Sequence, residues 1–179
     1  MEKRMAIVSA AVLVITLLSG LAMAYEFGDK WAFGKCPTCN KVLIHVGKDI
    51  MQPAGKKVYF NRSGTIKQIY NDSTWKTCVV IESNSTTFVL WHLDGASSDV
   101  KKNLGKYYDV NKSGKLYLGN VASLSSGNHI HVGQRSAPYG STSTISTAGA
   151  LPQCDHKYKG LPKYPEKFKC PDSDLLTLK

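Results

Sequence analysis

Two histidines separated by one residue, His129 and His131, lie in the stretch SGNHIHVGQR at residues 126–135. In a β-strand, residues i and i+2 project from the same face, roughly 6 to 7 Å apart. Ile130 and Val132 would then point the other way, into a core. Two imidazoles on one face can both bind one metal ion, or one can bind it while the other transfers a proton beside it. The pair can equally be two surface histidines without a role, so other residues have to decide.

Three further side chains of suitable chemistry lie at or directly after apolar, strand-like runs. His45 and Asp49 are four residues apart in HVGKD, and His92 follows the apolar run that ends in VLW. A histidine, a carboxylate and a further histidine are a common set of three protein ligands for catalytic zinc, which leaves the fourth position for water. Taken singly, each residue can also be structural, as a core histidine, a turn aspartate or the cap of a strand end.

The elements that must position these side chains are short β-rich runs separated by turn residues. Helical periodicity is almost absent after the first 24 residues, apart from one short helical turn expected within residues 94–103. The sequence therefore predicts an all-β fold, a compact antiparallel sandwich or barrel-like domain of short strands with an irregular C-terminal tail. The expected strands cover residues 42–46, 57–60, 65–70, 78–81, 87–91, 115–118 and 129–132.

The first 24 residues have the three parts of a secretory signal peptide. They are a charged start at residues 2–4, an apolar run at residues 5–18 and a small-x-small cleavage site at residues 22–24. The alternative is an uncleaved membrane anchor, because residues 5–24 are about long enough to span a bilayer. In both cases the remainder is exported, so we expect a secreted, periplasmic or cell-surface protein, without membrane attachment once the signal peptide is cleaved.

The chain is basic, with 23 Lys and Arg residues against 13 Asp and Glu residues and a formal net charge of +10. An exported basic protein meets anionic cell-wall polymers, lipid head groups and acidic glycans. Nucleic acid is not expected as a partner outside the cell. Charge therefore indicates where the protein adheres rather than which reaction it catalyses.

All five cysteines follow the predicted signal peptide, where disulfides are favoured. The odd number leaves one thiol over, and Cys78, in the apolar run TCVVI, is expected to be free and buried. Cys154 and Cys170 flank a segment rich in Lys, Tyr and Pro, and are predicted to be oxidised. The CxxC formed by Cys36 and Cys39 favours a disulfide, either local or to the tail, over half of a structural zinc site.

The ordered set of motifs resembles that of the lysostaphin-type zinc endopeptidases, the LytM-like peptidoglycan hydrolases, whose fold is a duplicated hybrid motif. HVGKDI is similar to the family's His-x-Gly-x-Asp-Ile, and VLWHLD to its Tyr-x-His-Leu. SSGNHIHVG resembles its Gly-x-His-Leu-His-Phe. PAGKKVYFNRSGTI looks like its Pro-x-Gly-x-x-Val-Tyr segment with the turn that follows. The resemblance covers residues 41–133.

The resemblance implies that His45, Asp49 and His131 bind zinc (Zn²⁺), and that His92 and His129 are the catalytic pair. Zinc with three protein ligands lowers the pKa of a bound water toward roughly 7. A histidine beside that water can accept its proton and pass it to the leaving amine, while a second histidine steadies the oxyanion. The function implied is an exported zinc metalloendopeptidase that hydrolyses peptide cross-links or bridges of cell-wall peptidoglycan.

The expected organisation has four parts. They are a signal peptide at 1–24, an N-terminal segment with the CxxC at 25–40, a metallopeptidase-like catalytic domain at 41–135, and a linker with a Cys-, Lys-, Tyr- and Pro-rich tail at 136–179. Two other functions compete with the hydrolase. One is a weak or inactive relative that binds the wall or regulates a partner, and the other is a secreted basic β-domain that binds an acidic glycan.

Overall fold

The computed structural model describes residues 30–35, 42–45, 47–139, 150–152, 168–169 and 171–179. The predicted signal peptide and four of the five cysteines, Cys36, Cys39, Cys154 and Cys170, lie outside the described residues. No helix within the described part of the chain is long and apolar enough to cross a membrane.

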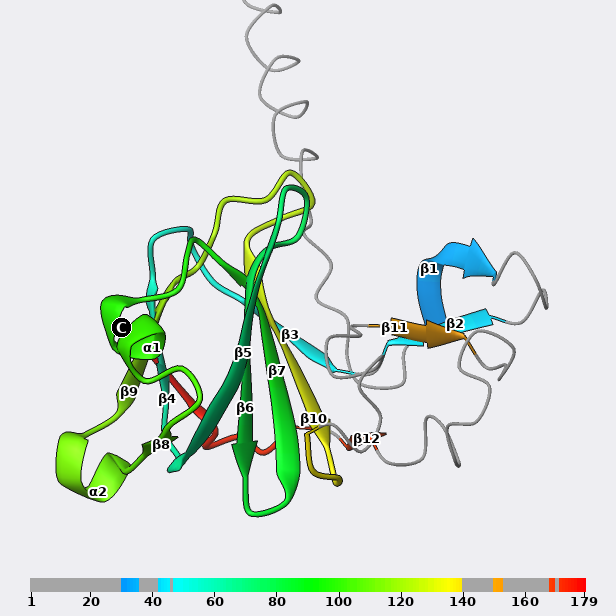
Figure 1. Ribbon diagram of the computed structural model, residues 1–179. Helices are drawn as coiled ribbons and strands as arrows, with labels where there is room; N and C mark the ends of the chain where they lie inside the picture. Colours follow the sequence, from blue (N-terminus) through cyan, green and yellow to red (C-terminus); the bar gives the residue numbers. More distant parts are fainter. Residues whose placement is uncertain (1–29, 36–41, 46, 140–149, 153–167, 170) are drawn as a thin grey trace, which may run out of the picture.

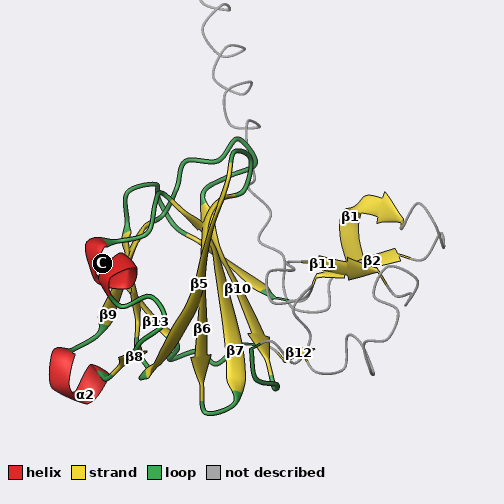
Figure 2. Ribbon diagram, viewed as in Figure 1, coloured by secondary structure: helices red, strands yellow, loops and turns green. Residues whose placement is uncertain are grey.

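The central sheet has seven strands in the order β12-β10-β7-β6-β5-β8, and β3 pairs with β10 beside this path. Every pairing in the sheet is antiparallel. Figures 1 and 2 show the long strands β5, β6, β7 and β10 side by side. The strand bounds are β3 Lys48–Met51, β5 Gly64–Asp72, β6 Lys76–Ser83, β7 Thr86–Leu93, β8 Tyr107–Tyr108, β10 His129–Arg135 and β12 Phe168–Lys169.

A second sheet of three strands, in the order β13-β4-β9, packs against one face of the central sheet. Its strands are β4 (Lys57–Phe60), β9 (Leu116–Asn120) and β13 (Leu176–Leu178). Both sheets contribute to one apolar core, because every second residue of each strand points inward. The fully buried core side chains include Val58, Phe60, Ile66, Val79, Ile81, Phe88, Leu90, Leu116, Leu118 and Ile130.

The predicted fold class is confirmed: the described strands form antiparallel sheets with few helices. They make an open sandwich, and the described residues contain no closed barrel. The strands expected from the sequence coincide with β2, β4, β5, β6, β7, β9 and β10. The expected helical turn is α1 (Ser98–Lys102), which begins where the Ser97 hydroxyl accepts a hydrogen bond from the backbone N–H of Val100. A second short helix, α2 (Val110–Ser113), follows β8.

A separate sheet of three strands, in the order β1-β2-β11, lies beside the sandwich in Figure 1. Its strands are β1 (Lys30–Lys35), β2 (Val42–His45) and β11 (Ala150–Pro152). Both pairings in this sheet are antiparallel, and His45 lies opposite Ala150.

Cys78 lies in β6, where it is free and completely buried, as the sequence predicts. Its side chain lies on the face of the central sheet that is turned away from the main core, next to Val80 and Val89. Burial raises the pKa of this thiol well above its usual range. The Cys78 thiol therefore stays protonated and unreactive at neutral pH.

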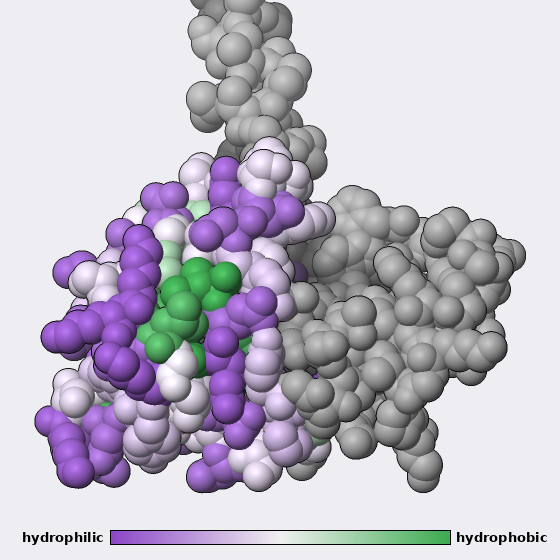
Figure 3. All heavy atoms as spheres, viewed as in Figure 1, coloured by the Kyte–Doolittle hydropathy of each residue, from purple (hydrophilic) through white to green (hydrophobic). Residues whose placement is uncertain are grey.

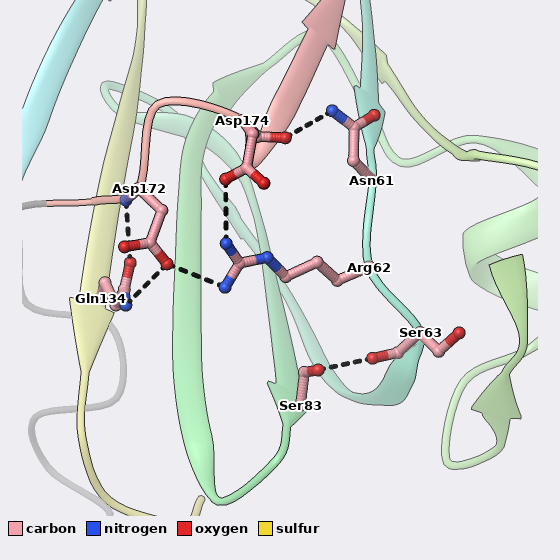
Figure 4. A network of polar contacts seen from close by, with 7 residues as sticks. All are labelled: Asn61, Arg62, Ser63, Ser83, Gln134, Asp172 and Asp174. Carbon is pink, nitrogen blue, oxygen red and sulfur yellow. Dashed lines mark hydrogen bonds and ion pairs between the residues drawn. The ribbon is translucent and has the colours of Figure 1, made fainter.

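The C-terminal end of the chain is part of the sandwich, although the sequence indicates an irregular tail there. Figure 4 shows how it is held: the Arg62 guanidinium pairs with Asp172 at 2.8 Å and with Asp174 at 3.0 Å. The Gln134 side chain accepts a hydrogen bond from the Asp172 backbone N–H at 3.1 Å, and the Asn61 amide donates to the Asp174 carbonyl oxygen. These ion pairs are partly exposed and contribute little individually. Their main effect is to direct the following residues into the core.

The Leu175→Ala variant tests whether the C-terminal end of the chain contributes to the stability of the core. Leu175 is 1% exposed and packs within the main core. Deleting its buried methyl groups should lower the free energy of unfolding by about 2–4 kcal/mol, measured by chemical denaturation. The matched control is Leu104→Ala, because Leu104 is 46% exposed. If both variants lose the same small amount, the C-terminal strand does not contribute to the core.

Candidate active site

Strand β10 is hydrogen-bonded on both sides at the point where the two histidines lie. On one side β3 pairs with it so that Asp49 is opposite His131 and Met51 is opposite His129. On the other side β7 pairs with it so that Trp91 is opposite His131. Residues directly opposite in antiparallel strands share a face of the sheet. The ladder therefore brings Asp49 and both histidines of the His-x-His pair to one face.

The alternation expected along β10 is confirmed by the residues between and after the histidines. Ile130 is 0% exposed and Val132 is 1% exposed, and both belong to the main core. Their neighbours His129 and His131 consequently point to the opposite face. His131 is almost fully buried there, and the His129 side chain keeps 12% of its surface exposed.

The closest polar contact between two of these side chains joins Asp49 to His131. Oδ1 of Asp49 lies 3.0 Å from Nδ1 of His131, and the two side chains are 4% and 3% exposed. Nε2 of His129 lies 3.8 Å from the same carboxylate oxygen. A carboxylate and two imidazoles thus converge in a buried position, which is the type of environment that binds a cation or relays a proton.

Gly47 provides room for the His131 ring. A Cβ atom at this position would lie 2.5 Å from Nε2 of His131 and 2.6 Å from the carbonyl oxygen of Val132. Both distances are shorter than real Cβ contacts, so only glycine allows the imidazole to pack directly against the backbone before β3. The glycine in HVGKD is therefore required by the position of the second histidine of HIH.

His92 joins the site through a β-bulge. The pairing of β6 with β7 shifts in register between Thr77 and Val79, where β7 contributes one residue more than β6. His92 lies at this shift with φ of +72°, a left-handed conformation that is uncommon for a residue other than glycine. Regular alternation would direct its side chain to the same face as Leu90, into the core. The bulge instead places the His92 ring 4.4 Å from the His129 ring, measured between centroids.

The environment of His92 keeps it neutral. Its ring is 6% exposed and lies 6.3 Å from the His131 ring. Burial, together with the electrostatic effect of the neighbouring His129, lowers the pKa of His92 to about 4. At neutral pH the ring is therefore uncharged and has one nitrogen that can accept a proton.

Backbone carbonyl groups orient two of the three histidines in the same way. Nδ1 of His92 lies 3.0 Å from the carbonyl oxygen of Trp75, and Nδ1 of His129 lies 2.8 Å from that of Gly127. A carbonyl oxygen only accepts hydrogen bonds, so each Nδ1 carries the proton and each Nε2 of the neutral ring is an acceptor. His131 differs, because its Nδ1 contacts the Asp49 carboxylate.

Four of the five residues expected from the sequence are brought together, and the fifth is placed only in part. Asp49, His92, His129 and His131 converge as described. His45 is the last residue of β2, three residues before β3 begins, and its side chain lies outside the description. Among the described side chains, no group of three His, Cys, Asp or Glu residues is arranged to hold a metal ion. Asp49 and His131 form a pair of adjacent zinc-type donors.

Sequence reasoning missed the contribution of the turn between β5 and β6. The Trp75 ring lies 5.9 Å from the His92 ring and is 46% exposed, and its carbonyl group orients His92. A tryptophan in the turn NDSTWK is the only signal that could have drawn attention to it. The carbonyl group of Gly127 orients His129, and a backbone contact of this kind cannot be predicted from the type of side chain.

A scan against protein-family models finds no match, and a search of curated proteins finds none. The structure is similar to a zinc-containing peptidase from Vibrio cholerae, with 22% identity and a TM-score of 0.48 over 63% of this chain and 32% of that one. It is also similar to lysostaphin, with 14% identity and a TM-score of 0.47 over 66% and 45% of the two chains. A third similar structure is the catalytic domain of a prophage-encoded M23 protein, EnpA from Enterococcus faecalis, with 17% identity and a TM-score of 0.46 over 72% and 88%.

The chain spans about a third of the length of the Vibrio cholerae peptidase. Because the three TM-scores are below 0.5, the function proposed for this protein rests on its own site residues.

The Gly47→Ala variant should disturb the site where the His131 ring packs against the backbone. The added methyl group would overlap the imidazole and the Val132 carbonyl, so the free energy of unfolding of the metal-free protein should fall by about 1–3 kcal/mol. The affinity for zinc should fall with it. Gly55→Ala is the control, because Gly55 has a φ of +82° but no atom within 4 Å of an added Cβ. That variant should show backbone strain of roughly 1 kcal/mol and unchanged zinc affinity. Wild-type stability and zinc affinity in Gly47→Ala would contradict the packing described.

Proposed function

We propose that this protein is a zinc-dependent endopeptidase, exported from the cell, that hydrolyses peptide cross-links or bridges of cell-wall peptidoglycan. The observation that carries the proposal is the convergence of Asp49, His92, His129 and His131 on one face of the central sheet. The buried contact between Asp49 and His131 lies at its centre. The peptide substrate is proposed from the ordered sequence motifs, which resemble those of peptidoglycan hydrolases.

The donor set is compatible with zinc. A carboxylate oxygen and an imidazole nitrogen 3.0 Å apart, both buried, are two of the ligand types that zinc prefers. We assign Asp49 and His131 as ligands, with His45 as the third. The bound ion would supply Lewis acidity and lower the pKa of a water molecule.

His92 and His129 are assigned to proton transfer. Both rings carry their proton on Nδ1, which donates to a backbone carbonyl, and both keep Nε2 as an acceptor. One Nε2 can take a proton from the attacking water and return it to the leaving amine, while the other ring, when Nε2 is also protonated, donates a hydrogen bond to the negatively charged carbonyl oxygen. His92 is suited to accepting a proton because burial keeps it neutral at pH 7. The 4.4 Å separation of the two ring centroids lets both act on the same group.

Export and adhesion complete the proposal. Residues 1–24 would act as the signal peptide, which assigns the protein to the cell surface, the periplasm or the medium. One surface region carries five exposed lysines against two aspartates, Asp99 and Asp109, within residues 98–115. The lysines are Lys101, Lys102, Lys106, Lys112 and Lys115.

This basic surface region also exposes apolar groups. Leu104 is 46% exposed and Tyr107 is 66% exposed. Figure 3 shows an apolar area bordered by hydrophilic side chains on the side of the molecule where α1 and β5 lie. Exposed lysines beside apolar and aromatic side chains suit an anionic polymer with a flexible backbone, such as a polyphosphate-type wall polymer. We propose that this region holds the enzyme near its substrate.

The two histidines of β10 should fail differently when each is replaced by alanine. His131→Ala removes a ligand, so zinc content, peptide hydrolysis and thermal stability should fall together. His129→Ala should keep zinc and most of the stability, and lose about 10²- to 10⁴-fold in turnover, because general acid–base assistance has that size. Zinc per protein is measured by elemental analysis, and hydrolysis by release of muropeptides.

Two results would contradict this assignment. If His129→Ala loses zinc and His131→Ala retains it, the two roles are exchanged. If wild-type protein binds no zinc, or if both variants retain it, the hydrolase is not zinc-dependent through these residues. Asn84→Ala, in the turn at the opposite end of β6 and β7, is the control for general loss of stability, since Asn84 has a φ of +48° and lies far along the strands from the site.

Adhesion through the basic surface is tested with two charge-matched double variants. Lys102→Gln/Lys106→Gln should elute from immobilised poly(glycerol phosphate) at clearly lower salt than wild type, because exposed charges within a Debye length of a polyanion act strongly on retention. Lys56→Gln/Lys57→Gln removes the same charge near the start of β4 and should elute close to wild type. Equal shifts for both variants would mean that retention follows net charge rather than this surface.

A further inference from the structure

The turn between β5 and β6 has a conformation that depends on one carboxylate. Asp72 ends β5 and Lys76 begins β6 opposite it. Oδ1 of Asp72 accepts hydrogen bonds from the backbone N–H groups of Thr74 at 2.8 Å and Trp75 at 2.7 Å. This Asx-type turn is followed by Lys76 with a φ of +67°, which turns the chain back into β6. Residues 72–76 are termed the hairpin tip.

The hairpin tip reaches the site through a backbone group. The Trp75 carbonyl oxygen accepts the hydrogen bond from Nδ1 of His92 at 3.0 Å. This contact places the proton of neutral His92 on Nδ1, which leaves Nε2 as the acceptor. The direction of the Trp75 carbonyl depends on the turn, and the turn depends on Asp72. A carboxylate at the end of β5 thus acts on a histidine at the end of β7.

The side chain of Trp75 gives the hairpin tip a second property. Its indole lies next to His92, with ring centroids 5.9 Å apart and planes inclined by 47°, yet 46% of its surface remains exposed. Tryptophan is enriched at binding surfaces, because a partner that covers its exposed ring buries a large apolar area. A flat indole face beside the proton-transfer residue suits the backbone of an extended peptide that passes it.

We propose that the hairpin tip is part of the active site, with Asp72 as a positioning residue that fixes the tautomer of His92 and Trp75 as a substrate-contacting residue. The inference rests on the proposed peptidase function for its substrate. Its positioning part concerns only residues of this chain, and is measurable without any reaction. The two parts can be tested separately. Asp72 acts through the backbone of the turn, whereas the Trp75 indole would contact the substrate directly.

The positioning part is tested on the full chain labelled with ¹⁵N-histidine, in metal-free and zinc-loaded form. Ring ¹⁵N–¹H correlation spectra should show the wild-type His92 protonated on Nδ1. Asp72→Ala removes the acceptor of two backbone N–H groups, so both tautomers of His92 should be populated. Its kcat should fall by about tenfold to a hundredfold, as for other small misplacements of reacting groups. Asp72→Asn retains the Oδ1 acceptor and should restore the single tautomer and most of kcat.

The substrate-contacting part is tested by kinetics with a soluble cross-linked muropeptide. Trp75→Ala keeps the backbone carbonyl, so the His92 tautomer and kcat should stay within about twofold of wild type, while KM rises about fivefold or more. Trp75→Phe should recover part of the loss. Asn84→Ala, in the turn at the other end of β6, reports on strain in a turn remote from His92 and should leave the tautomer unchanged.

The outcomes distinguish this inference from the proposed function. A wild-type tautomer in Asp72→Ala, or no rescue by Asp72→Asn, overturns the positioning role whether or not the protein hydrolyses peptides. An unchanged KM in Trp75→Ala overturns the contact with substrate. If the wild-type protein hydrolyses no muropeptide, the proposed function fails, and the tautomer measurements still decide the role of Asp72.

Discussion

Hydrogen bonding of β10 to strands on both sides is the constraint on which the candidate site depends. β3 fixes Asp49 opposite His131, and β7 fixes Trp91 opposite it on the other side. The polar groups at the centre therefore come from strands in a continuous ladder rather than from loops. Sites built on strands hold their side chains within a small tolerance, because the core beneath β10 also locks the positions of Ile130 and Val132.

Much of this site could be predicted from the sequence, because a strand has a period of two residues. The His-x-His pair and the Ile and Val between and after them already define which face of β10 is polar. The resemblance implies that Asp49 lies near His131, but none of the expected strands covers residues 48–51, so β3 was not predicted. His92 could not be placed by the same rule, because strict alternation directs it into the core beside Leu90, and only the bulge turns it toward His129. A bulge is a property of two paired strands, and neither strand shows it alone.

The parts of the fold that depend on interactions within a short segment could be predicted from the sequence. The short strands that the sequence predicts from apolar alternation lie at the predicted positions in the structure. The buried free thiol of Cys78 was also predictable, from the apolar run around it. The packing of the C-terminal end was not, because residues 171–179 show no clear alternation. Their place depends on the Arg62 ion pairs with Asp172 and Asp174, more than 100 residues away in the chain. Contacts over such separations depend on the finished sandwich rather than on the segment itself.

The interleaving of core and site residues along β10 has a genetic consequence. Deleting or inserting a single codon within β10 would exchange the two faces for the rest of the strand, so that an imidazole would enter the apolar layer and an apolar side chain would take its place. One such event would disrupt the contact between Asp49 and His131, the position of His129 and part of the core together. Homologous sequences should therefore differ in length in the segments that connect the strands. The number of residues in the strand from residue 129 to residue 135 should be the same in all of them.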